Sequence, residues 1–432
     1  MKRHVLTHIL GPLRVKIFIL STIFFMVRVA IIPVGGEAVR LRPLTVETSK
    51  AMVRFLNRPL VELSILHLAQ QGVREFYFGV RGYHNYKDIY DYFREGSWFS
   101  AKYGTEVRIR YMPRVDTRGN AEAVLATLEY YDIEEPVLVI QGDNVFRLNV
   151  EEMYKLHIAK KAFLTIALKE ELGDLVEYGV AAVDEDLRIL KFVEKPKKRE
   201  EAPSNLVNTG LYLLSEDFKK FFQGEVGKKL YEEGKLDFGG DVIPSIIENG
   251  LPVYGFITKD YWFDVGSPER YLKAIYYLLG YLSSAELEAD EIAPRVYAQG
   301  TSEQSKSLKS KISDDIRRNV IKIEGPVLIG RHVQIGQDTY IKNSVIDNYV
   351  IIREKSKIED SVVMDRSYIE KGVVIHRSII GRHVHIREGA IIEDSVLADD
   401  VSVGEGAYLK KVKVWPHKKV EREVKLEGFT VI

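Results

Sequence analysis

Two glycines followed by two cationic side chains form the first stretch of the sequence that could do chemistry. An apolar run at 31–34 leads into Gly35 and Gly36, and Arg40 and Lys50 follow. Because glycine has no Cβ atom, its backbone N–H can approach a polyphosphate closely, and fixed cations beside it offset the phosphate charge. The pattern predicts a phosphate-binding loop after a strand.

Two aspartates follow apolar strands later in the chain. The sequence VLVIQGDNVF contains Asp143, and YWFDVGSPER contains Asp264. Capping of the next turn would explain one such aspartate. Two at strand ends can instead share one Mg²⁺, which takes a few carboxylate oxygens and leaves the remaining positions to water and phosphate. We predict that Asp143 and Asp264 are magnesium ligands.

Polar side chains of another kind follow two further strands. FVEKP contains Glu194 and Lys195, and VNTGLYLL contains Asn208 and Thr209. Carboxylate and amide groups bind sugar hydroxyls in pairs, and a lysine can hold a sugar phosphate, although an isolated Glu-Lys pair is usually a surface ion pair. These residues predict a site for a phosphorylated polyhydroxyl ligand.

The elements that must position these residues alternate between strand and helix from residue 29 to about 280. Strands are expected at 76–80, 107–111, 137–140 and 163–168, with helices such as 59–71 and 121–130 between them. The alternation predicts an α/β sheet with crossover helices and a ligand site at the carboxyl ends of the strands.

A different architecture is expected after a polar linker, with a possible helix, at 283–320. Aliphatic residues then recur at spacings of six, six and five, and four serines share the resulting period of seventeen. A coil with three flat sides, each pointing one aliphatic residue inward, explains this period. We predict a parallel β-helix of about five coils over 321–432. The four serines are Ser344, Ser361, Ser378 and Ser395.

Length and composition narrow the class of protein. The 432 residues predict two or three domains, and 62 basic against 62 acidic side chains give no global field to recruit nucleic acid or an anionic membrane. The sequence has no cysteine, which excludes disulfides, thiolate zinc sites and cysteine nucleophiles and points to the cytoplasm.

Basic residues and an apolar run at 17–27 open the chain. The run is too short to span a bilayer and lacks a small-residue cleavage motif. We expect residues 1–25 to be an extension or a misassigned start, with the first domain beginning at Met26 and no membrane association.

Residues 29 to about 280 resemble the sugar-phosphate nucleotidyltransferases, whose glycine loop, GD, EKP, NTG and WxDxG motifs occur here in order. The seventeen-residue repeat is similar to the C-terminal β-helix of the subgroup that contains mannose-1-phosphate guanylyltransferases and ADP-glucose pyrophosphorylases. The resemblance implies a Rossmann-like nucleotidyltransferase domain over 26–282 and a left-handed β-helix over 321–432.

The resemblance also implies roles by position. Nucleotide phosphates would lie against Gly35, Gly36 and Arg40, the sugar 1-phosphate against Lys50 and Lys195, and Mg²⁺ against the two aspartates. The sugar pocket would contain Gly179, Glu194, Asn208 and Thr209, and the base would lie near Gly119 and Asn120. A phosphate oxygen of the sugar 1-phosphate would attack the α-phosphorus of a nucleoside triphosphate and expel pyrophosphate, without a protein nucleophile.

Three positions depart from the family pattern. Ala38-Val39 replaces Gly-Thr in the loop, Ser49 replaces the proline before Lys50, and Met112 replaces a polar residue that reads the base in thymidylyl and uridylyl members. Met112 removes one expected hydrogen bond to thymine or uracil. Together with the Gly-Gly loop and the type of β-helix, this favours GTP, and thus a mannose-1-phosphate guanylyltransferase that self-associates through its β-helix.

Three alternatives stay open. The first is a glucose-1-phosphate thymidylyl- or uridylyltransferase, and the second is a catalytically silent regulatory subunit. The third adds acetyl transfer in the β-helix by one of three histidines, His376, His383 and His385.

Overall fold

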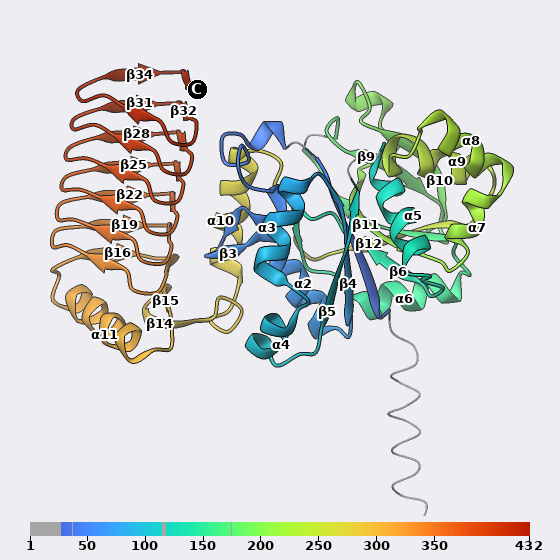
Figure 1. Ribbon diagram of the computed structural model, residues 1–432, viewed down its shortest axis with the longest axis horizontal. Helices are drawn as coiled ribbons and strands as arrows, with labels where there is room; N and C mark the ends of the chain where they lie inside the picture. The colour runs from blue at the N-terminus through green and yellow to red at the C-terminus, as the bar shows by residue number, and fades with distance from the viewer. Residues whose placement is uncertain (1–26, 37, 115–117, 174) are drawn as a thin grey trace, which may run out of the picture. The chain divides into compact units, whose positions relative to one another are not determined.

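The protein forms two compact units, and the first is a twisted mixed sheet with helices on both faces (Figure 1). The computed structural model describes residues 27–36, 38–114, 118–173 and 175–432. The first unit contains the described residues of the ranges 27–35, 64–142 and 146–262. The expectations for residues 1–25 and for a start at Met26 lie outside the described residues.

The sheet of this unit confirms the predicted α/β class. Its strands run in the order β10, β9, β11, β6, β1, β4, β5, with β8 beside β11 and β12 beside β8. The pairs of β1 with β4 and β6, and of β4 with β5, are parallel, whereas β11 runs antiparallel to β6. The strands are β1 (Val29–Val34), β4 (Glu75–Arg81), β5 (Arg108–Arg114), β6 (Val137–Val139), β8 (Leu164–Glu170), β9 (Gly179–Val183), β10 (Ile189–Glu194), β11 (Leu206–Leu214) and β12 (Val253–Thr258).

Helices cover the sheet because one side of each is apolar. Helix α5 packs on β1, β4 and β5, and α6 packs on β8, β11 and β12. The buried side chains of α5 join the core beneath it. The helices are α2 (Leu60–Gln70), which has residues in both units, α3 (Tyr83–Phe93), α4 (Ser97–Tyr103), α5 (Asn120–Tyr130), α6 (Val150–Ala159), α7 (Phe218–Gln223), α8 (Glu225–Glu233) and α9 (Ile243–Glu248), with short turns η3 (Arg199–Glu201) and η4 (Phe238–Val242).

The second unit joins two short upstream segments to the C-terminal part of the chain. It contains residues 36–63, 143–145 and 263–432. The loop that carries Lys50 thus belongs to the same compact unit as the C-terminal residues. Its elements before the β-helix are η1 (Val39–Leu41), η2 (Lys50–Met52), β2 (Arg54–Phe55), β3 (Arg58–Pro59), α10 (Pro268–Tyr281), and the ends of β7 (Asn144–Phe146) and β13 (Trp262–Asp264), which pair with each other.

The β-helix has three sheets whose strands stack coil upon coil (Figure 1). The strands run parallel, apart from the antiparallel pair of β14 (Ala289–Ala293) and β15 (Val296–Gln299) at the start of one sheet. Within residues 289–432, all of which are described, the sheets contain nine, seven and six strands, more than about five coils would supply. One sheet has β17 (Val327–Ile329), β20 (Val345–Ile346), β23 (Val362–Val363), β26 (Ile379–Ile380), β29 (Val396–Leu397), β32 (Lys413–Val414) and β35 (Thr430–Val431) after β14 and β15. The second has β16 (Lys322–Glu324), β19 (Tyr340–Lys342), β22 (Lys357–Glu359), β25 (Val374–His376), β28 (Ile391–Glu393), β31 (Tyr408–Lys410) and β34 (Lys425–Glu427), and the third has β18 (Gln334–Ile335), β21 (Ile351–Ile352), β24 (Tyr368–Ile369), β27 (His385–Ile386), β30 (Ser402–Val403) and β33 (Lys419–Val420).

The period of seventeen is set by buried rows that run along the β-helix. Ile346, Val363 and Ile380 are register partners in successive coils, and all three are fully buried. The four serines on the same period form a second row, in which each serine bonds to the next. For example, the N–H of Ser378 donates to Oγ of Ser361 at 3.1 Å. Non-glycine residues adopt positive φ at the corners on the same period. The architecture is consistent with the expected left-handed β-helix.

The structure differs from the expected linker at 283–320. This stretch contains β14 (Ala289–Ala293), β15 (Val296–Gln299) and α11 (Glu303–Arg317), and β15 pairs in parallel with β17. Val296 and Ile312 are buried in the core of the β-helix. The possible helix is present as α11, and the strands have few apolar residues because only one face of each element is buried at the end of the stack.

Among the helices of the described ranges, none is both long enough and apolar enough to cross a membrane.

Candidate functional site

The ammonium group of Lys50 lies between two carboxylates in the second unit. Nζ contacts Oδ2 of Asp143 and lies 3.7 Å from Oδ1 of Asp264. Asp143 follows β6 in the chain, Asp264 ends β13, and the N–H of Val265 donates to the carbonyl of Asp143 at 3.1 Å. This backbone bond holds the two aspartates side by side, so the structure brings together three residues that the sequence predicted separately.

Two arginines complete the charge cluster. Arg270 donates from Nη1 to Oδ2 of Asp264 at 2.7 Å, from the first turn of α10, which Ser267 caps by accepting from the Arg270 N–H. Arg40 lies in the exposed turn η1. A Cβ atom on Gly266 would come within 3.0 Å of Oδ2 of Asp264 and 3.4 Å of Nη2 of Arg40. Because Gly266 has no side chain, the Asp264 carboxylate and the Arg40 guanidinium can both lie close to it.

The electrostatics of Asp264 reflect this crowding. Burial raises the pKa of its carboxyl above the ordinary value, and the neighbouring Asp143 raises it further, while Lys50, Arg270 and Arg40 act in the opposite direction. The net effect is that the ionised form of Asp264 costs free energy in the folded protein. A further cation beside it would relieve that cost.

Asp143 and Asp264 can bind a hard divalent cation if other oxygen ligands complete its coordination. Within the described residues, no cluster of three or more histidine, cysteine or acidic side chains could hold a metal. Two carboxylates suffice for Mg²⁺ only when water and substrate phosphate supply the other oxygens. The donor set is therefore that of a metal bound together with a nucleotide, and Lys50 and the metal would draw on the same carboxylates.

A second group of predicted residues lies around Glu194 in the first unit. A Cβ atom on Gly179 would come within 2.5 Å of Oε2 of Glu194, and one on Gly239 would overlap the same oxygen. Two glycines from different segments therefore enclose one carboxylate. Burial raises the pKa of Glu194 above the ordinary value and Asp237 adds to this, while Lys195 counteracts it. The Glu194 side chain is 27% exposed, so a half-buried carboxylate packed against two glycines can still accept hydrogen bonds from hydroxyl groups.

The three other residues predicted to bind the sugar or its phosphate, Lys195, Asn208 and Thr209, differ in what their side chains contact. Lys195 has φ of 44°, and its side chain is 63% exposed with Nζ 3.7 Å from Oε1 of Glu194. The amide of Asn208 bonds to Oη of Tyr212 and to the N–H of Gly210, each at 2.9 Å. Thr209 is buried and donates to the carbonyl of Ala167 at 2.7 Å. Lys195 is therefore the most accessible of the three, and Thr209 supports the strand.

The residues predicted near the base make structural contacts in the same unit. A Cβ atom on Gly119 would overlap the carbonyl oxygen of Leu236, and Oδ1 of Asn120 accepts from the N–H of Phe238 at 2.8 Å. The start of α5 is thereby joined to the segment that carries Gly239.

The predicted phosphate-loop glycines differ from each other. A Cβ atom on Gly35 would lie 2.7 Å from Cβ of Arg81, whereas Gly36 is exposed with open space at its Cα. Gly35 is required by the close approach to β4, and Gly36 leaves its backbone accessible.

Two residues of these clusters were missed by sequence reasoning. Arg270 could have been found from SPER after Asp264, where a capped helix start places a side chain back toward the preceding strand end. Gly239 lies in the turn η4, a π-helical turn with paired glycines, a feature that often marks functional sites.

The three histidines considered for acetyl transfer are each paired with an acid in the β-helix. His376 lies 3.6 Å from Asp360, His383 lies 3.4 Å from Asp400, and His385 lies 2.6 Å from Glu370. They occupy different sides of the coil and do not form one cluster.

Comparison with known proteins extends these observations. Residues 29–280 match the family model described as nucleotidyl transferase, and residues 323–429 match the GMPPB C-terminal domain. A UTP--glucose-1-phosphate uridylyltransferase of Synechocystis is 29% identical over 79% of this chain and 88% of its own length. A glucose-1-phosphate adenylyltransferase of Trichlorobacter lovleyi is 27% identical over 80% and 95%. A solved structure of a proposed glucose-1-phosphate thymidylyltransferase from Bacillus anthracis has a TM-score of 0.48 and 21% identity over 57% of this chain and 92% of that one.

Proposed function

The chain belongs to the nucleotidyl transferase family and its relatives are sugar-1-phosphate nucleotidyltransferases, and on that premise we propose that it makes GDP-mannose from mannose 1-phosphate and GTP. The observation that carries the reaction type is the contact of Lys50 with both Asp143 and Asp264. The preference for guanine is supported by the GMPPB type of C-terminal domain and by Met112.

In this proposal the charge cluster serves the phosphates. Lys50 and Arg40 neutralise the anionic groups that must approach each other, and Arg270 keeps Asp264 oriented through its 2.7 Å bond. Enzymes of this family generally use a divalent metal. Mg²⁺ held by Asp143 and Asp264 would supply positive charge for the triphosphate. The protein contributes orientation and fixed cations, and no side chain forms a covalent intermediate.

The residues around Glu194 serve the sugar. Glu194 accepts hydrogen bonds from hydroxyl groups in the space left by Gly179 and Gly239, and Lys195 binds the sugar phosphate. Asn208 orients the pocket through its bonds to Tyr212 and Gly210. Gly119 and Asn120 set the start of α5 near the base.

We also propose that the protein is a homo-oligomer that associates through the β-helix. The C-terminal end of the stack exposes Phe429, at 59%, and Ile432, at 77%. A β-helix must protect its ends and edges, which favours association. Sedimentation velocity tests this: a single monomeric species at micromolar concentration would contradict it.

The test of the function is a matrix of substrates. Mannose 1-phosphate and glucose 1-phosphate are each incubated with GTP, dTTP, UTP or ATP and Mg²⁺, and pyrophosphate release is measured. The highest kcat/KM is expected for mannose 1-phosphate with GTP, and Asp143→Asn should abolish it. A preference for another pair would overturn the proposed substrate, and no turnover with any pair would favour the regulatory subunit.

A further inference from the structure

The loop that carries Lys50 ends in a hairpin that contacts the β-helix. The hairpin has strands β2 and β3, and its turn residues Leu56 and Asn57 have φ of 49° and 66°, as a two-residue turn requires. Its tip is not exposed: Phe55 and Leu56 are almost fully buried. The Phe55 ring packs on Tyr271 of α10, and Nδ2 of Asn57 in the turn donates to the carbonyl of Ile346 in the β-helix at 3.4 Å.

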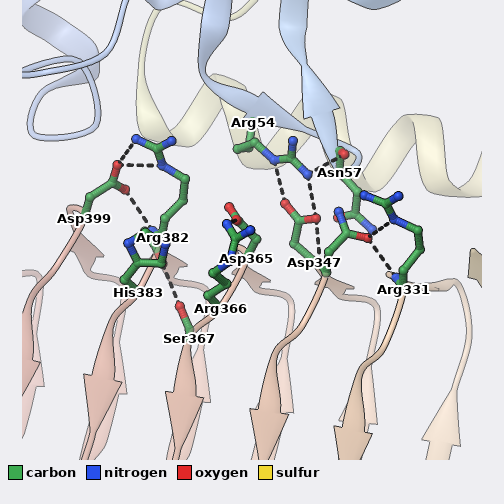
Figure 2. A network of polar contacts seen from close by, with 12 residues as sticks. Arg54, Asn57, Arg331, Asp347, Asp365, Arg366, Ser367, Arg382, His383 and Asp399 are labelled. Atoms are coloured by element: carbon green, nitrogen blue, oxygen red, sulfur yellow. Dashed lines mark hydrogen bonds and ion pairs between the residues drawn. The ribbon is translucent and has the colours of Figure 1, made fainter. Parts of the chain in front are cut away.

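One ion pair fixes this contact (Figure 2). Arg54 donates from Nε to Oδ2 of Asp347 and from Nη2 to Oδ1, each at 2.7 Å. The Asp347 side chain is only 1% exposed, and Oδ1 also accepts from the N–H of Asn348 at 2.7 Å. A carboxylate buried to this extent is costly unless it is paired, so the hairpin has one preferred position against the coil.

Neighbouring contacts hold the same hairpin from other sides. Asn57 donates to Oε1 of Gln299 at 3.0 Å, and Arg58 donates to Oε1 of Glu288 at 2.7 Å. The hydroxyl of Tyr271 in α10 donates to the carbonyl of Arg54 at 2.6 Å. The hairpin is thus fixed at both strands and at its turn.

The hairpin is connected to Lys50 by a short, hydrogen-bonded stretch of backbone. The N–H of Val53 donates to the carbonyl of Lys50 at 3.3 Å, and the N–H of Leu60 in turn donates to the carbonyl of Val53 at 3.0 Å. A displacement of Arg54 would therefore displace Lys50 as well. The small space beside this stretch, about 20 Å³, is lined by residues such as Met52, Arg382 and Asp399 and leaves little room for another arrangement.

We propose that Arg54 and Asp347 are positioning residues for Lys50: the buried pair seats the hairpin on the β-helix and thereby sets the ammonium group against Asp143 and Asp264. The C-terminal domain then helps to position the loop that carries Lys50. This inference rests on the proposed role of Lys50 in the reaction.

The first test compares two aspartates of the β-helix. Asp347→Asn keeps the shape of the side chain and removes the charge that holds Arg54. Asp394→Asn is the matched control, because Asp394 also accepts two bonds from one arginine, Arg377, at 2.6 and 2.8 Å, but within the β-helix. Since a displacement of about 1 Å can lower a rate about 100-fold, Asp347→Asn should lower kcat about 10-fold to 100-fold with little change in KM. Equal kcat in the two variants would overturn the proposal.

The second test is a double-mutant cycle with Lys50→Ala. If the pair acts by placing Lys50, then adding Asp347→Asn to Lys50→Ala should lower kcat no further. If the losses multiply, the pair acts independently of Lys50 and the proposal is wrong. Arg54→Lys, which keeps a cation beside the buried carboxylate but loses the two-bond geometry, replaces Asp347→Asn in this cycle if that variant does not fold.

A third measurement separates this inference from the proposed function. Hydrogen exchange of amides in residues 38–53 should be faster in Asp347→Asn than in wild type and in Asp394→Asn. This result is expected even if the wild-type protein turns over none of the substrate pairs, in which case the function fails and the anchoring stands. Unchanged exchange in this segment would overturn the anchoring itself.

Discussion

Arg270 donates from Nη1 to Oδ2 of Asp264 at 2.7 Å, so the carboxylate at the end of β13 is held by a side chain from the helix that follows it. The other oxygen, Oδ1, faces Lys50 at 3.7 Å. Asp264 therefore has one oxygen fixed by the scaffold and one directed to the predicted reaction centre. Four predictions follow from this geometry and from the two units that contain the predicted residues.

Removing the shared ammonium should slow catalysis without unfolding the protein. Lys50→Ala should lower kcat about 100-fold to 1000-fold, the loss typical of one preorganised charge. Pyrophosphate release under saturating substrate measures it. Lys357→Ala is the control, because Lys357 is a half-exposed lysine of the β-helix that pairs with Glu359 at 2.7 Å. Comparable kcat values for the two variants would contradict the role of Lys50.

Asp264 should make stability depend on pH in an unusual direction. Its pKa is raised by burial and by Asp143, so the folded protein holds a proton that the unfolded chain releases as pH rises. The contribution of Asp264 to stability then falls as pH rises from the ordinary aspartate pKa through the raised one. Asp264→Asn should therefore increase the unfolding temperature at neutral pH, and the gain should disappear in acid.

Asp394 serves as the control, because its pKa is shifted in the opposite direction from that of Asp264. Hydrogen bonds from Arg377 hold the pKa of Asp394 below its ordinary value. Asp394→Asn should therefore lower the unfolding temperature at neutral pH, with the loss vanishing as acid protonates the wild-type carboxyl. Thermal unfolding followed by circular dichroism across pH distinguishes the two variants. The same sign in both would refute the account of Asp264.

Two adjacent glycines should respond differently to a single methyl group. A Cβ atom on Gly239 would overlap Oε2 of Glu194, whereas one on Gly240 would lie 3.5 Å from Oδ1 of Asp237, an ordinary contact. Gly239→Ala should displace Glu194 and raise KM for the sugar 1-phosphate about 10-fold, roughly the loss of one hydrogen bond to a charged group. Gly240→Ala should leave KM close to wild type. Steady-state kinetics decide, and equal KM values would place the sugar elsewhere.

The serine row of the β-helix should carry measurable stability. Ser378 donates from Oγ to the carbonyl of His376 at 2.8 Å and accepts from the N–H of Ser395 at 3.0 Å, and it is fully buried. Ser378→Ala leaves the buried N–H of Ser395 without that partner and should cost about 1–3 kcal/mol. Denaturant unfolding measures this. Ser402→Ala, at a half-buried position of β30, should lower the free energy of unfolding much less. A similar loss in both variants would mean that the hydrogen bonds of the serine row add no particular stability.

Sequence reasoning identified Asp143, Asp264 and Glu194 because each lies at the end of an apolar strand, which is a local feature, and it identified Lys50 as a cation that follows the glycine loop. It could not assign what surrounds them. Gly239, which encloses Glu194, comes from a turn with no pattern that connects it to that strand. The strands at 289–299 were also missed, because their few apolar residues become a pattern only when they pair with the next coil.

The alternation of strands and helices and the seventeen-residue coil can be recognised in the amino-acid order alone, since both are repeats whose period follows from backbone geometry and burial. That Arg270 holds Asp264 and that Arg54 reaches the buried Asp347 is visible only in the folded chain. Each of these pairs joins residues with no shared period. Their meeting depends on how distant segments pack, and a charged pair can then be buried only where the fold has already placed both partners.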